Sequence, residues 1–417
     1  MKLFYFAFES IFDPVFDSQV IEFIKEFNLR SVSDEKIRLV VLGSFNDLFK
    51  KGYWSKRKKI NSALEGNCFF FFKVPYFYRF PFLLDISLFI NAFISCMVIY
   101  QFMGLKKPKN VLFHCRTEIA GYVLLKVRGK FFRNARVICD CRGVGSKEIL
   151  YKYPGKKGNI LSNKIRDIED FAHNNSDLLF CVSESFKRFI QGNNQKHLDI
   201  EVIPCCINTV KFKFDAKVRD KKRKEMGIDD RFAVLYSGSL NEWQLPEEMI
   251  NIFKVFQKNI EDSIFVLFTR DMGFAEDLIA RSGLKSGSYI IESKSFDEIG
   301  SYLQVGDLGL LIREENDVNR VAFPIKFTEY VRSGVPVLTS ITSDVAGLIV
   351  KFNAGFIMKD HNDQKEIERT VLKVRSDIDH IKSNEYKEKI SNLIGEEISW
   401  EKHISMVKEA YKGTING

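Results

Sequence analysis

The feature that most constrains the fold is an alternation of short apolar runs with longer helical stretches through both halves of this 417-residue chain. Apolar runs of about four to six residues without clean alternation are typical of strands buried on both faces, as in parallel sheets wrapped by helices. The pattern predicts an α/β protein with two Rossmann-like domains whose parallel sheets face a central cleft. The runs are KLFYFAF, IRLVVLG, NVLFHC, ARVICD, DLLFCVS and IEVIP in the first half, and FAVLYSG, SIFVLFT, YIIES, DLGLLIR, VPVLTS and AGFIM in the second.

The length also favours two domains, because single cores stop growing at about 250–300 residues. Residues 206–230 are polar and basic, and we interpret them as a linker or as one solvated helix. We therefore expect domains over residues 1–206 and 207–396, and a C-terminal helix over 397–417 that crosses back toward the N-terminal domain. This helix should bury one face; the residues spaced along it are Ile398, His403, Met406 and Tyr411.

The cysteines and the charge set limits on the cellular setting. All eight cysteines lie before residue 207, several inside apolar runs, and no CxxC pair is followed by a second one. This favours buried, reduced thiols in the cytoplasm and no zinc site. The N-terminus lacks the pattern of a signal peptide. The formal charge of +9 suits phosphate-rich ligands or an anionic membrane surface, and scattered surface lysines give the same sum.

Two apolar segments bear on membrane contact. Residues 88–103 are shorter than the ~20 residues that span a bilayer and contain Asn91 and Gln101, so we predict a buried helix. Residues 68–86 interleave Phe and Tyr with Lys73 and Arg79. Such a mixture suits an interfacial surface on anionic lipid. The alternative is a partly buried loop and helix in a chain with 39 phenylalanines.

The stretch AFPIKFTEYVRSGVPVL, residues 322–338, predicts an anion site. Phe323 and Pro324 precede a helix whose first turn holds Lys326, and the N-terminus of a helix attracts anions. Glu329, one turn on, faces the same side and can accept hydrogen bonds from a ribose. The alternative is an ordinary amphipathic helix with a surface lysine and glutamate.

The segment FPIKFTEYVRSGVPVL resembles the donor site of the retaining GT-B glycosyltransferases of family 4, and LQVGDLGLLIR, VLYSGSL and ISWEKHISMVKEAY resemble further segments of that family. The resemblance implies transfer of a sugar from a nucleotide-diphosphate sugar to a hydroxyl, with an acceptor-binding N-terminal domain and a donor-binding C-terminal domain. It implies that Glu329 holds the ribose and that Lys326 lies near the diphosphate. The turn facing the phosphates would be Ser237, Gly238 and Ser239.

The sequence departs from the family pattern at three places. Val321 stands where the common E-x7-E motif has its first glutamate, no basic residue follows the glycine turn before Lys254, and residues 9–20 contain no glycine. The negative charge of the phosphates would then have to be neutralised by Lys326, Arg313 or Arg320. These departures also raise the possibility of a chain without activity.

In the N-terminal half, polar residues follow two predicted strands. His114 and Arg116 end one strand, and Asp140 and Arg142 end the next, where related enzymes have a catalytic turn. We expect His114, Asp140 and Arg142 to serve catalysis with Lys326. The alternatives are a structural histidine and a buried ion pair. The candidates for acceptor binding are Arg116 and Glu148. Trp243 would either stack on a base or sugar or pack against other side chains of the protein.

Sugar transfer places negative charge on the departing diphosphate, so cations and backbone N–H groups should carry the catalysis. The leaving phosphate can accept the proton of the incoming hydroxyl, so we expect no enzymic nucleophile, no cofactor and no metal. The predicted role is synthesis of a bacterial surface polysaccharide or glycolipid, on a glycan or lipid-linked acceptor, at the inner face of the cell membrane. The alternatives are an inactive sugar-nucleotide-binding scaffold subunit and a nucleotide-sugar epimerase. Nucleic-acid binding is disfavoured because no recognisable module combines basic and aromatic residues.

Overall fold

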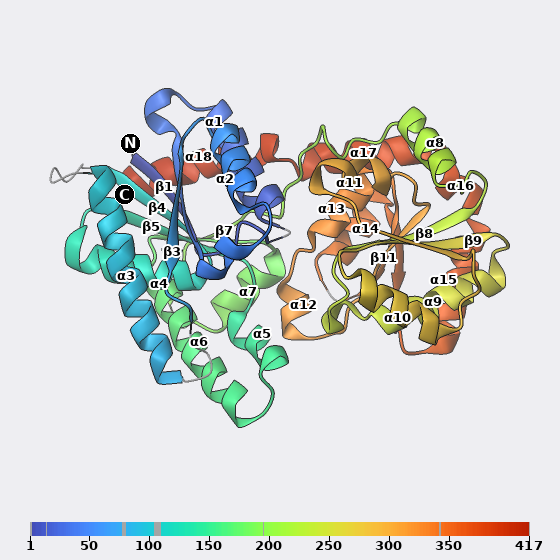
Figure 1. The fold of residues 1–417 in the computed structure, drawn as a ribbon, viewed down its shortest axis with the longest axis horizontal. Helices are drawn as coiled ribbons and strands as arrows, with labels where there is room; N and C mark the ends of the chain where they lie inside the picture. Colours follow the sequence, from blue (N-terminus) through green and yellow to red (C-terminus); the bar gives the residue numbers. More distant parts are fainter. Residues whose placement is uncertain are drawn as a thin grey trace. The chain divides into compact units, whose positions relative to one another are not determined.

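The computed structural model describes residues 2–13, 15–76, 81–103, 110–194, 196–341 and 343–416 (Figure 1). The chain divides into two compact units. The N-terminal unit comprises Met1–Pro204 together with Trp400–Gly417, and the C-terminal unit comprises Cys205–Ser399. We expected the domain boundaries after residues 206 and 396, and the structure has them after Pro204 and Ser399.

The N-terminal unit is built on a parallel sheet with seven strands in the described part of the chain, in the order β3-β2-β1-β4-β5-β6-β7. The order reverses between β1 and β4, so their carboxyl ends flank the crevice where such sheets bind ligands. The central strands are almost completely buried, which explains their continuous apolar sequence. The strands are β1 (Lys2–Ala7), β2 (Ile37–Ser44), β3 (Cys68–Lys73), β4 (Val111–Arg116), β5 (Arg136–Cys141), β6 (Leu178–Cys181) and β7 (Ile200–Val202).

Helices cover this sheet, and α4 and α6 pack on each other. A Cβ on Gly121 of α4 would lie 2.8 Å from Cys139 Sγ of β5 and 3.6 Å from Ala172 Cβ of α6. The missing side chain therefore allows these three elements to approach closely. The helices are α1 (Glu22–Leu29), α2 (Tyr53–Ala63), α3 (Pro81–Met103), α4 (Glu118–Phe131), α5 (Gly145–Lys152), α6 (Lys156–Asn175), α7 (Glu184–Gly192) and α18 (Trp400–Asn416).

Helix α3 differs from the expectation of a buried helix. Its stretch Leu83–Gln101 is long and apolar enough to cross a membrane by length and composition alone, and 44% of the most apolar window is buried within the protein. Leu84, Leu88 and Ile99 are buried, but an apolar stripe remains exposed on the other side. Residues 77–80 of the aromatic block, which include Arg79, lie outside the described residues.

The C-terminal helix α18 packs on the N-terminal unit. Trp400 lies 5.1 Å from Phe23 between ring centroids and donates its indole N–H to Ser18 O at 3.4 Å. Tyr411 is fully buried beside Phe27 of α1. The expectation that Met406 belongs to the buried face is wrong, because Met406 is 41% exposed. The buried face is formed by Trp400, His403, Ile404, Val407 and Tyr411.

The C-terminal unit repeats the architecture with a parallel sheet of six strands within the described residues, in the order β10-β9-β8-β11-β12-β13. The order reverses between β8 and β11, so the segments that follow these two strands flank the ligand-binding crevice of this unit. The strands are β8 (Phe232–Ser237), β9 (Ser263–Phe268), β10 (Tyr289–Glu292), β11 (Leu308–Leu311), β12 (Val337–Ser340) and β13 (Gly355–Met358).

Its helices surround the sheet, and a continuous apolar core joins them to it. Helix α13 follows Pro324, which caps its N-terminus with extended backbone. It ends at a glycine with φ +73°, Gly334, before β12. The helices are α8 (Ala216–Glu225), α9 (Pro246–Asn259), α10 (Met272–Ser282), α11 (Phe296–Leu303), α12 (Asp317–Val321), α13 (Ile325–Arg332), α14 (Val345–Phe352), α15 (Gln364–Ser376), α16 (Ile378–Lys382) and α17 (Asn384–Glu397).

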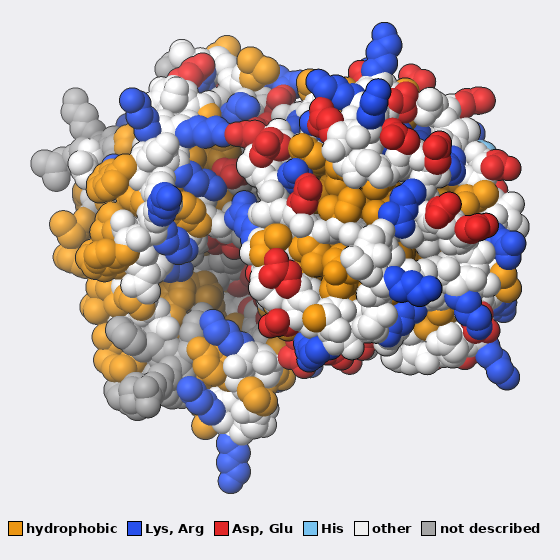
Figure 2. Space-filling view, turned by 45° about the vertical axis from the view of Figure 1, so that its right-hand side comes forward, with side chains coloured by type: hydrophobic (Ala, Val, Ile, Leu, Met, Phe, Trp, Pro, Cys, Tyr) orange, Lys and Arg blue, Asp and Glu red, His pale blue; other side chains and the backbone are white. Residues whose placement is uncertain are grey.

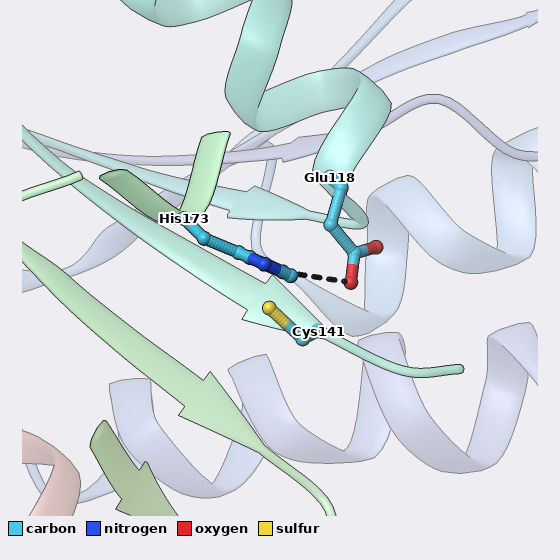
Figure 3. A group of neighbouring side chains, drawn as sticks. All are labelled: Glu118, Cys141 and His173. Atoms are coloured by element: carbon cyan, nitrogen blue, oxygen red, sulfur yellow. Dashed lines mark ion pairs between the residues drawn. The ribbon is translucent and has the colours of Figure 1, made fainter. Parts of the chain in front are cut away.

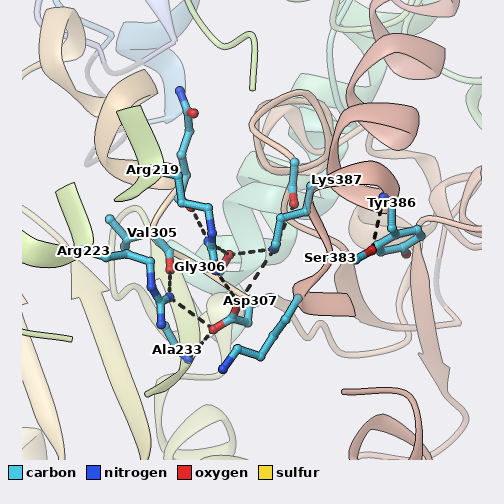
Figure 4. A network of polar contacts seen from close by, with 12 residues as sticks. Arg219, Arg223, Ala233, Val305, Gly306, Asp307, Ser383, Tyr386 and Lys387 are labelled. Carbon is cyan, nitrogen blue, oxygen red and sulfur yellow. Dashed lines mark hydrogen bonds and ion pairs between the residues drawn. The ribbon is translucent and has the colours of Figure 1, made fainter. Parts of the chain in front are cut away.

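A buried polar network joins α8 to this core (Figure 4). Asp307, fully buried before β11, accepts from Arg219 Nη2 at 2.6 Å, from Arg223 Nη1 at 3.2 Å and from Ala233 N at 2.9 Å. Lys387 Nζ of α17 lies 3.8 Å from the same carboxylate. The interpretation of this segment as a linker or solvated helix is therefore wrong for α8, which buries Arg219 and Arg223.

Candidate functional site

The turn after β8 lies against the first turn of α13. Gly238 has a φ of +142°, and a Cβ there would lie 2.6 Å from Lys326 Nζ, so the position requires glycine. The Lys326 ammonium donates to Tyr236 Oη at 2.7 Å and to Gln244 Oε1 at 2.9 Å. The structure therefore brings together Lys326 and the turn formed by Ser237, Gly238 and Ser239.

Two tyrosines fix the shape of this turn. The Ser237 N–H donates to Tyr330 Oη at 2.6 Å, and the Tyr236 hydroxyl donates to Ser239 O at 2.6 Å. Tyr330 reaches this position because Gly309 of β11 has no side chain; a Cβ there would lie 2.5 Å from Tyr330 Cδ2. The residue after Glu329 in the donor segment thus positions the turn through its hydroxyl group.

The charged side chains of this site are partly buried and shift one another's pKa values. Burial and, secondarily, Arg313 hold the pKa of Lys326 well below its usual range, although Glu329 opposes that shift. Burial raises the pKa of Glu329 to about 7, and Lys326 and Lys211 oppose this shift. A bound anion would relieve the repulsion between Lys326 and Arg313.

Of the two arginines considered for the phosphates, Arg313 is the one beside Lys326. It follows β11 at the reversal of strand order, burial lowers its pKa, and its Nε has no hydrogen-bond partner among the described residues. Arg320 of α12 is exposed and pairs with Asp317 at 3.3 Å and Glu315 at 3.8 Å. An exposed pair of this kind leaves the side chain largely in solvent.

The neighbouring positions have packing roles. Val321, at the place of the first motif glutamate, is buried, as are Phe323 and Pro324. Trp243 is 43% exposed in the short helical turn that also contains Gln244.

In the N-terminal unit, His114, Asp140 and Arg142 form one cluster. The His114 Nδ1 lies 2.6 Å from Tyr411 Oη, and its Nε2 lies 3.3 Å from Asp140 Oδ2. Arg142 donates to the same Asp140 oxygen from Nε at 2.8 Å and from Nη2 at 2.5 Å. The ring of Tyr5 stacks on the imidazole with 4.4 Å between centroids.

The protonation states of this cluster follow from burial and charge. Burial lowers the pKa of His114, although Asp140 opposes the shift. Burial would raise the pKa of Asp140, but Arg142, His114 and Arg116 outweigh it and lower this pKa to about 2. The neutral imidazole of His114 then orients the ionised carboxylate of Asp140. The His114 side chain is almost completely buried, with 3% of its surface exposed.

Arg116 and Glu148 occupy different surroundings. The Arg116 Nε donates to both carboxylate oxygens of Glu9, at 3.0 and 2.9 Å, so the pair joins the ends of β4 and β1 at the reversal of strand order. Its Nη1 is buried without a hydrogen-bond partner in the described part of the chain. Glu148 is exposed on α5, with Oε1 close to Gly143.

Sequence reasoning missed several members of these sites. Tyr330 belongs to the quoted donor segment, so its place in the motif was a usable signal. Tyr236 likewise belongs to the quoted segment VLYSGSL. Gln244, Tyr5 and Glu9 carry no pattern of their own and are recognised only from their contacts.

Comparison with known proteins places this geometry in a structural class. Residues 218–393 match the family model "Glycosyl transferases group 1". HepE from Anabaena, solved in complex with UDP, has a TM-score of 0.71 at 13% identity, with 99% of this chain and 100% of that chain covered. Sucrose-phosphate synthase from Thermosynechococcus elongatus has a TM-score of 0.72 at 12% identity, with 99% of both chains covered.

A third similar structure is WaaG, described as a glycosyltransferase involved in lipopolysaccharide biosynthesis, with a TM-score of 0.64 at 12% identity and both chains fully covered. No curated protein sequence matches the chain. The protein therefore has the GT-B fold, as the sequence predicted. The region similar to the group 1 glycosyl transferases lies within the C-terminal unit.

Proposed function

We propose that the protein is a retaining glycosyltransferase of the family 4 type, which transfers a sugar from a nucleotide-diphosphate sugar to a hydroxyl of a glycan or lipid-linked acceptor. The observation that carries this proposal is the contact of Lys326 with the Gly238 turn. Glu329 lies one turn further along the same helix. Lys326 and the Gly238 turn would bind the diphosphate, and the Glu329 carboxylate would bind the ribose that follows it.

In the proposed reaction the bond between the anomeric carbon and the diphosphate oxygen breaks, and the bond to the acceptor oxygen forms on the same face. The proton of the acceptor hydroxyl passes to the departing phosphate, so no side chain acts as nucleophile. Lys326, Arg313 and the N-terminus of α13 stabilise the negative charge that develops on the diphosphate. Lys326 gains most there, because the leaving group provides a counter-ion to a partly buried ammonium whose charge is disfavoured in the free protein.

The N-terminal unit is proposed to contact the transferred sugar or the acceptor through Asp140 and Arg142, with His114 as a positioning residue. Asp140 is held ionised, so it can accept hydrogen bonds from sugar hydroxyls. Arg116 and Glu148 are proposed to bind the acceptor. No metal or cofactor enters this scheme.

Nucleotide binding tests the proposal. Because HepE is described with UDP and with UDP-glucose, UDP is the first probe, followed by GDP, ADP and CMP. A ligand at 100 times its Kd adds about 2.7 kcal/mol of stability, which corresponds to a rise in Tm of roughly 5–10 °C. We expect one diphosphate to give this shift and Glu329→Ala to lose most of it. An exposed-lysine variant, Lys351→Ala, should keep the shift.

The same titration depends on pH. In the free protein the pKa of Glu329 is about 7, and ribose hydroxyls donate to the ionised carboxylate, so binding should tighten as pH rises through that value. Between pH 6 and 8 the ionised fraction rises about tenfold, and affinity should rise by a similar factor. Glu329→Gln should remove this part of the pH dependence. An absence of any shift with all four nucleotides would contradict the donor site.

A second candidate, a binding subunit without turnover, is favoured by Val321 and by the absence of basic residues between Ser239 and Lys254. It predicts the same nucleotide binding but no release of diphosphate from the bound sugar donor with any acceptor. Single-turnover release of UDP from UDP-glucose separates the two candidates.

We also propose that the protein works as a peripheral protein on the inner face of the membrane. Helix α3 exposes an apolar stripe at helical spacing; its members are Ile86, Phe89, Ile90, Phe93 and Met97. An apolar groove of about 700 Å³ between β3 and α3 adjoins it, lined in part by Phe71, Phe72 and Met97. In Figure 2, hydrophobic side chains gather along the edge of the N-terminal unit where α3 lies.

Cations also lie next to the edge strand β3, on helix α2, which covers the face of the sheet opposite to α3 (Figure 1). Helix α2 exposes Trp54, Lys58 and Lys59, and Arg57 lies 4.8 Å from the centre of the Phe70 ring in β3. An aromatic and basic surface of this kind suits anionic lipid headgroups.

Vesicle binding tests this surface. The protein should co-sediment with phosphatidylglycerol vesicles, less at high salt, and poorly with phosphatidylcholine. Each phenylalanine contributes about 1.5–3 kcal/mol when buried, so Phe89→Asp with Phe93→Asp should weaken binding at least tenfold. The control is Leu372→Asp, an exposed leucine of α15. Equal binding of both variants would contradict the proposed surface.

A further inference from the structure

Three potential metal-ligating side chains converge in the N-terminal unit, away from the proposed transfer chemistry. Glu118 is the first residue of α4, Cys141 is the last residue of β5, and His173 lies in the last turn of α6. Their ligand atoms all lie within 4.8 Å of one another, and all three residues are buried. Figure 3 shows the carboxylate, thiol and imidazole pointing toward one another.

The fold brings these residues together through close packing of their elements. Gly121 of α4 lies against Cys139 of β5 and Ala172 of α6, which neighbour the three residues in sequence. Thr117, before Glu118, has a φ of +76°, which is strained for a β-branched residue. The Thr117 N–H donates to Asp140 O at 2.9 Å, which ties the start of α4 to β5.

The polar atoms of the cluster lack the partners that buried groups normally have. Glu118 Oε1 and His173 Nε2 are 3.6 Å apart, and neither has a hydrogen bond among the described residues. Both side chains are more than nine-tenths buried. Unpaired buried polar atoms are costly, so an occupant that binds both would be strongly favoured.

The local charge favours a cation as that occupant. Glu169, one turn before His173 on α6, is a second buried carboxylate. Its Oε1 accepts from Ser146 N at 2.9 Å. A dication with one glutamate and one cysteine thiolate gives a neutral set, with Glu169 beside it.

We infer that Glu118 Oε1, Cys141 Sγ and His173 Nε2 form a site for a divalent transition-metal ion, with zinc as the best match. Sulfur, imidazole nitrogen and carboxylate oxygen are the ligands that zinc takes. Tetrahedral ligands at zinc distances lie roughly 3.3–3.8 Å apart, a spacing that Glu118 and His173 already have. The Cys141 thiol loses its proton on binding, and the fourth position is open to Glu169 or water.

This site would join β5 to α4 and α6 in the same unit that holds Asp140 and Arg142. Its role is structural, because no step of the proposed transfer passes through it. The inference is therefore independent of the proposed function. It also revises the expectation, drawn from the absence of paired CxxC motifs, that the chain has no zinc site.

The test uses the full-length protein, purified without added metal and analysed for bound zinc. We expect about one zinc per chain, a lower Tm after removal by a chelator, and recovery of Tm on return of zinc. Cobalt added to the metal-free protein should give a sulfur-to-cobalt charge-transfer band in the near ultraviolet.

Variants assign the ligands. Cys141→Ser should abolish the charge-transfer band, and Glu118→Gln and His173→Ala should weaken cobalt binding by about 100-fold or more. Cys68→Ser, in the edge strand β3, should leave the band unchanged. A folded wild-type protein that binds neither zinc nor cobalt would overturn the inference and leave a buried histidine–glutamate pair. A band that survives in Cys141→Ser would also overturn it.

Discussion

Replacing Asp307 by Ala is expected to destabilise the C-terminal unit by about 3–5 kcal/mol. The carboxylate is completely buried and balances Arg219, Arg223 and Lys387, so its removal leaves buried cations without their counter-ion. For a unit of this size the loss corresponds to a fall in Tm of roughly 6–20 °C. Urea denaturation followed by circular dichroism should show a lower midpoint with an unchanged slope.

A matched control lies on the same helix. Asp220 is adjacent to Arg219 but exposed, so Asp220→Ala should change stability by less than about 0.5 kcal/mol. The pH dependence has a defined sign. Burial opposes ionisation, but Arg219, Lys387 and Arg223 lower the pKa of Asp307 below 3.8. The stabilisation is therefore present above about pH 4 and lost as pH falls through the folded pKa. A change below 1 kcal/mol in Asp307→Ala would contradict the role of this network.

Replacing Lys326 by Met is expected to lower kcat by about 10²–10³-fold, because the variant keeps most of the side-chain volume but loses the charge facing the diphosphate. The effect on KM should be smaller, since the charge on the leaving group grows in the transition state. Release of UDP from UDP-glucose in the presence of acceptor measures both constants. If UDP-glucose is not a donor, the nucleotide sugar with the largest thermal shift replaces it.

Two controls separate this effect from a loss of general charge or of fold. Lys351→Ala removes an exposed lysine of the same unit that pairs with Glu397 at the surface, and should leave kcat unchanged. The Tm of Lys326→Met should not fall, because burial disfavours the lysine charge. A variant that is fully active would remove Lys326 from the mechanism, whereas one that fails to bind UDP would assign it to ground-state binding.

Every apolar run used in the sequence analysis overlaps a strand of the structure, because buried parallel strands leave a strong local signal. Strand β3 was missed, although it pairs with β2 along its whole length. Its sequence CFFFFK is an aromatic run that also suits an interfacial segment, and its edge position leaves most of the strand half-buried. Only the pairing with β2 distinguishes the two interpretations.

The donor segment was readable because its chemistry is local: Lys326, Glu329 and the capping Pro324 lie within six residues of sequence. Contacts between distant residues were not readable. The approach of Gly238 to Lys326 and the hydroxyl of Tyr330 on Ser237 depend on the return of the chain across the sheet. The basic residues of α8 were misinterpreted for the same reason, since their buried partner, Asp307, lies more than eighty residues away.

The N-terminal unit is completed by the last segment of the chain, since His114 meets Tyr411 and Phe23 meets Trp400. During synthesis these partners emerge only after the whole C-terminal unit has been made. The C-terminal unit is one uninterrupted segment, Cys205–Ser399, so it can reach its final fold first. The N-terminal unit cannot be completed until α18 has been synthesised. We therefore expect the C-terminal unit to finish folding before the N-terminal unit, although it is synthesised later. A chain truncated before α18 should have an incompletely folded N-terminal unit that depends on chaperones.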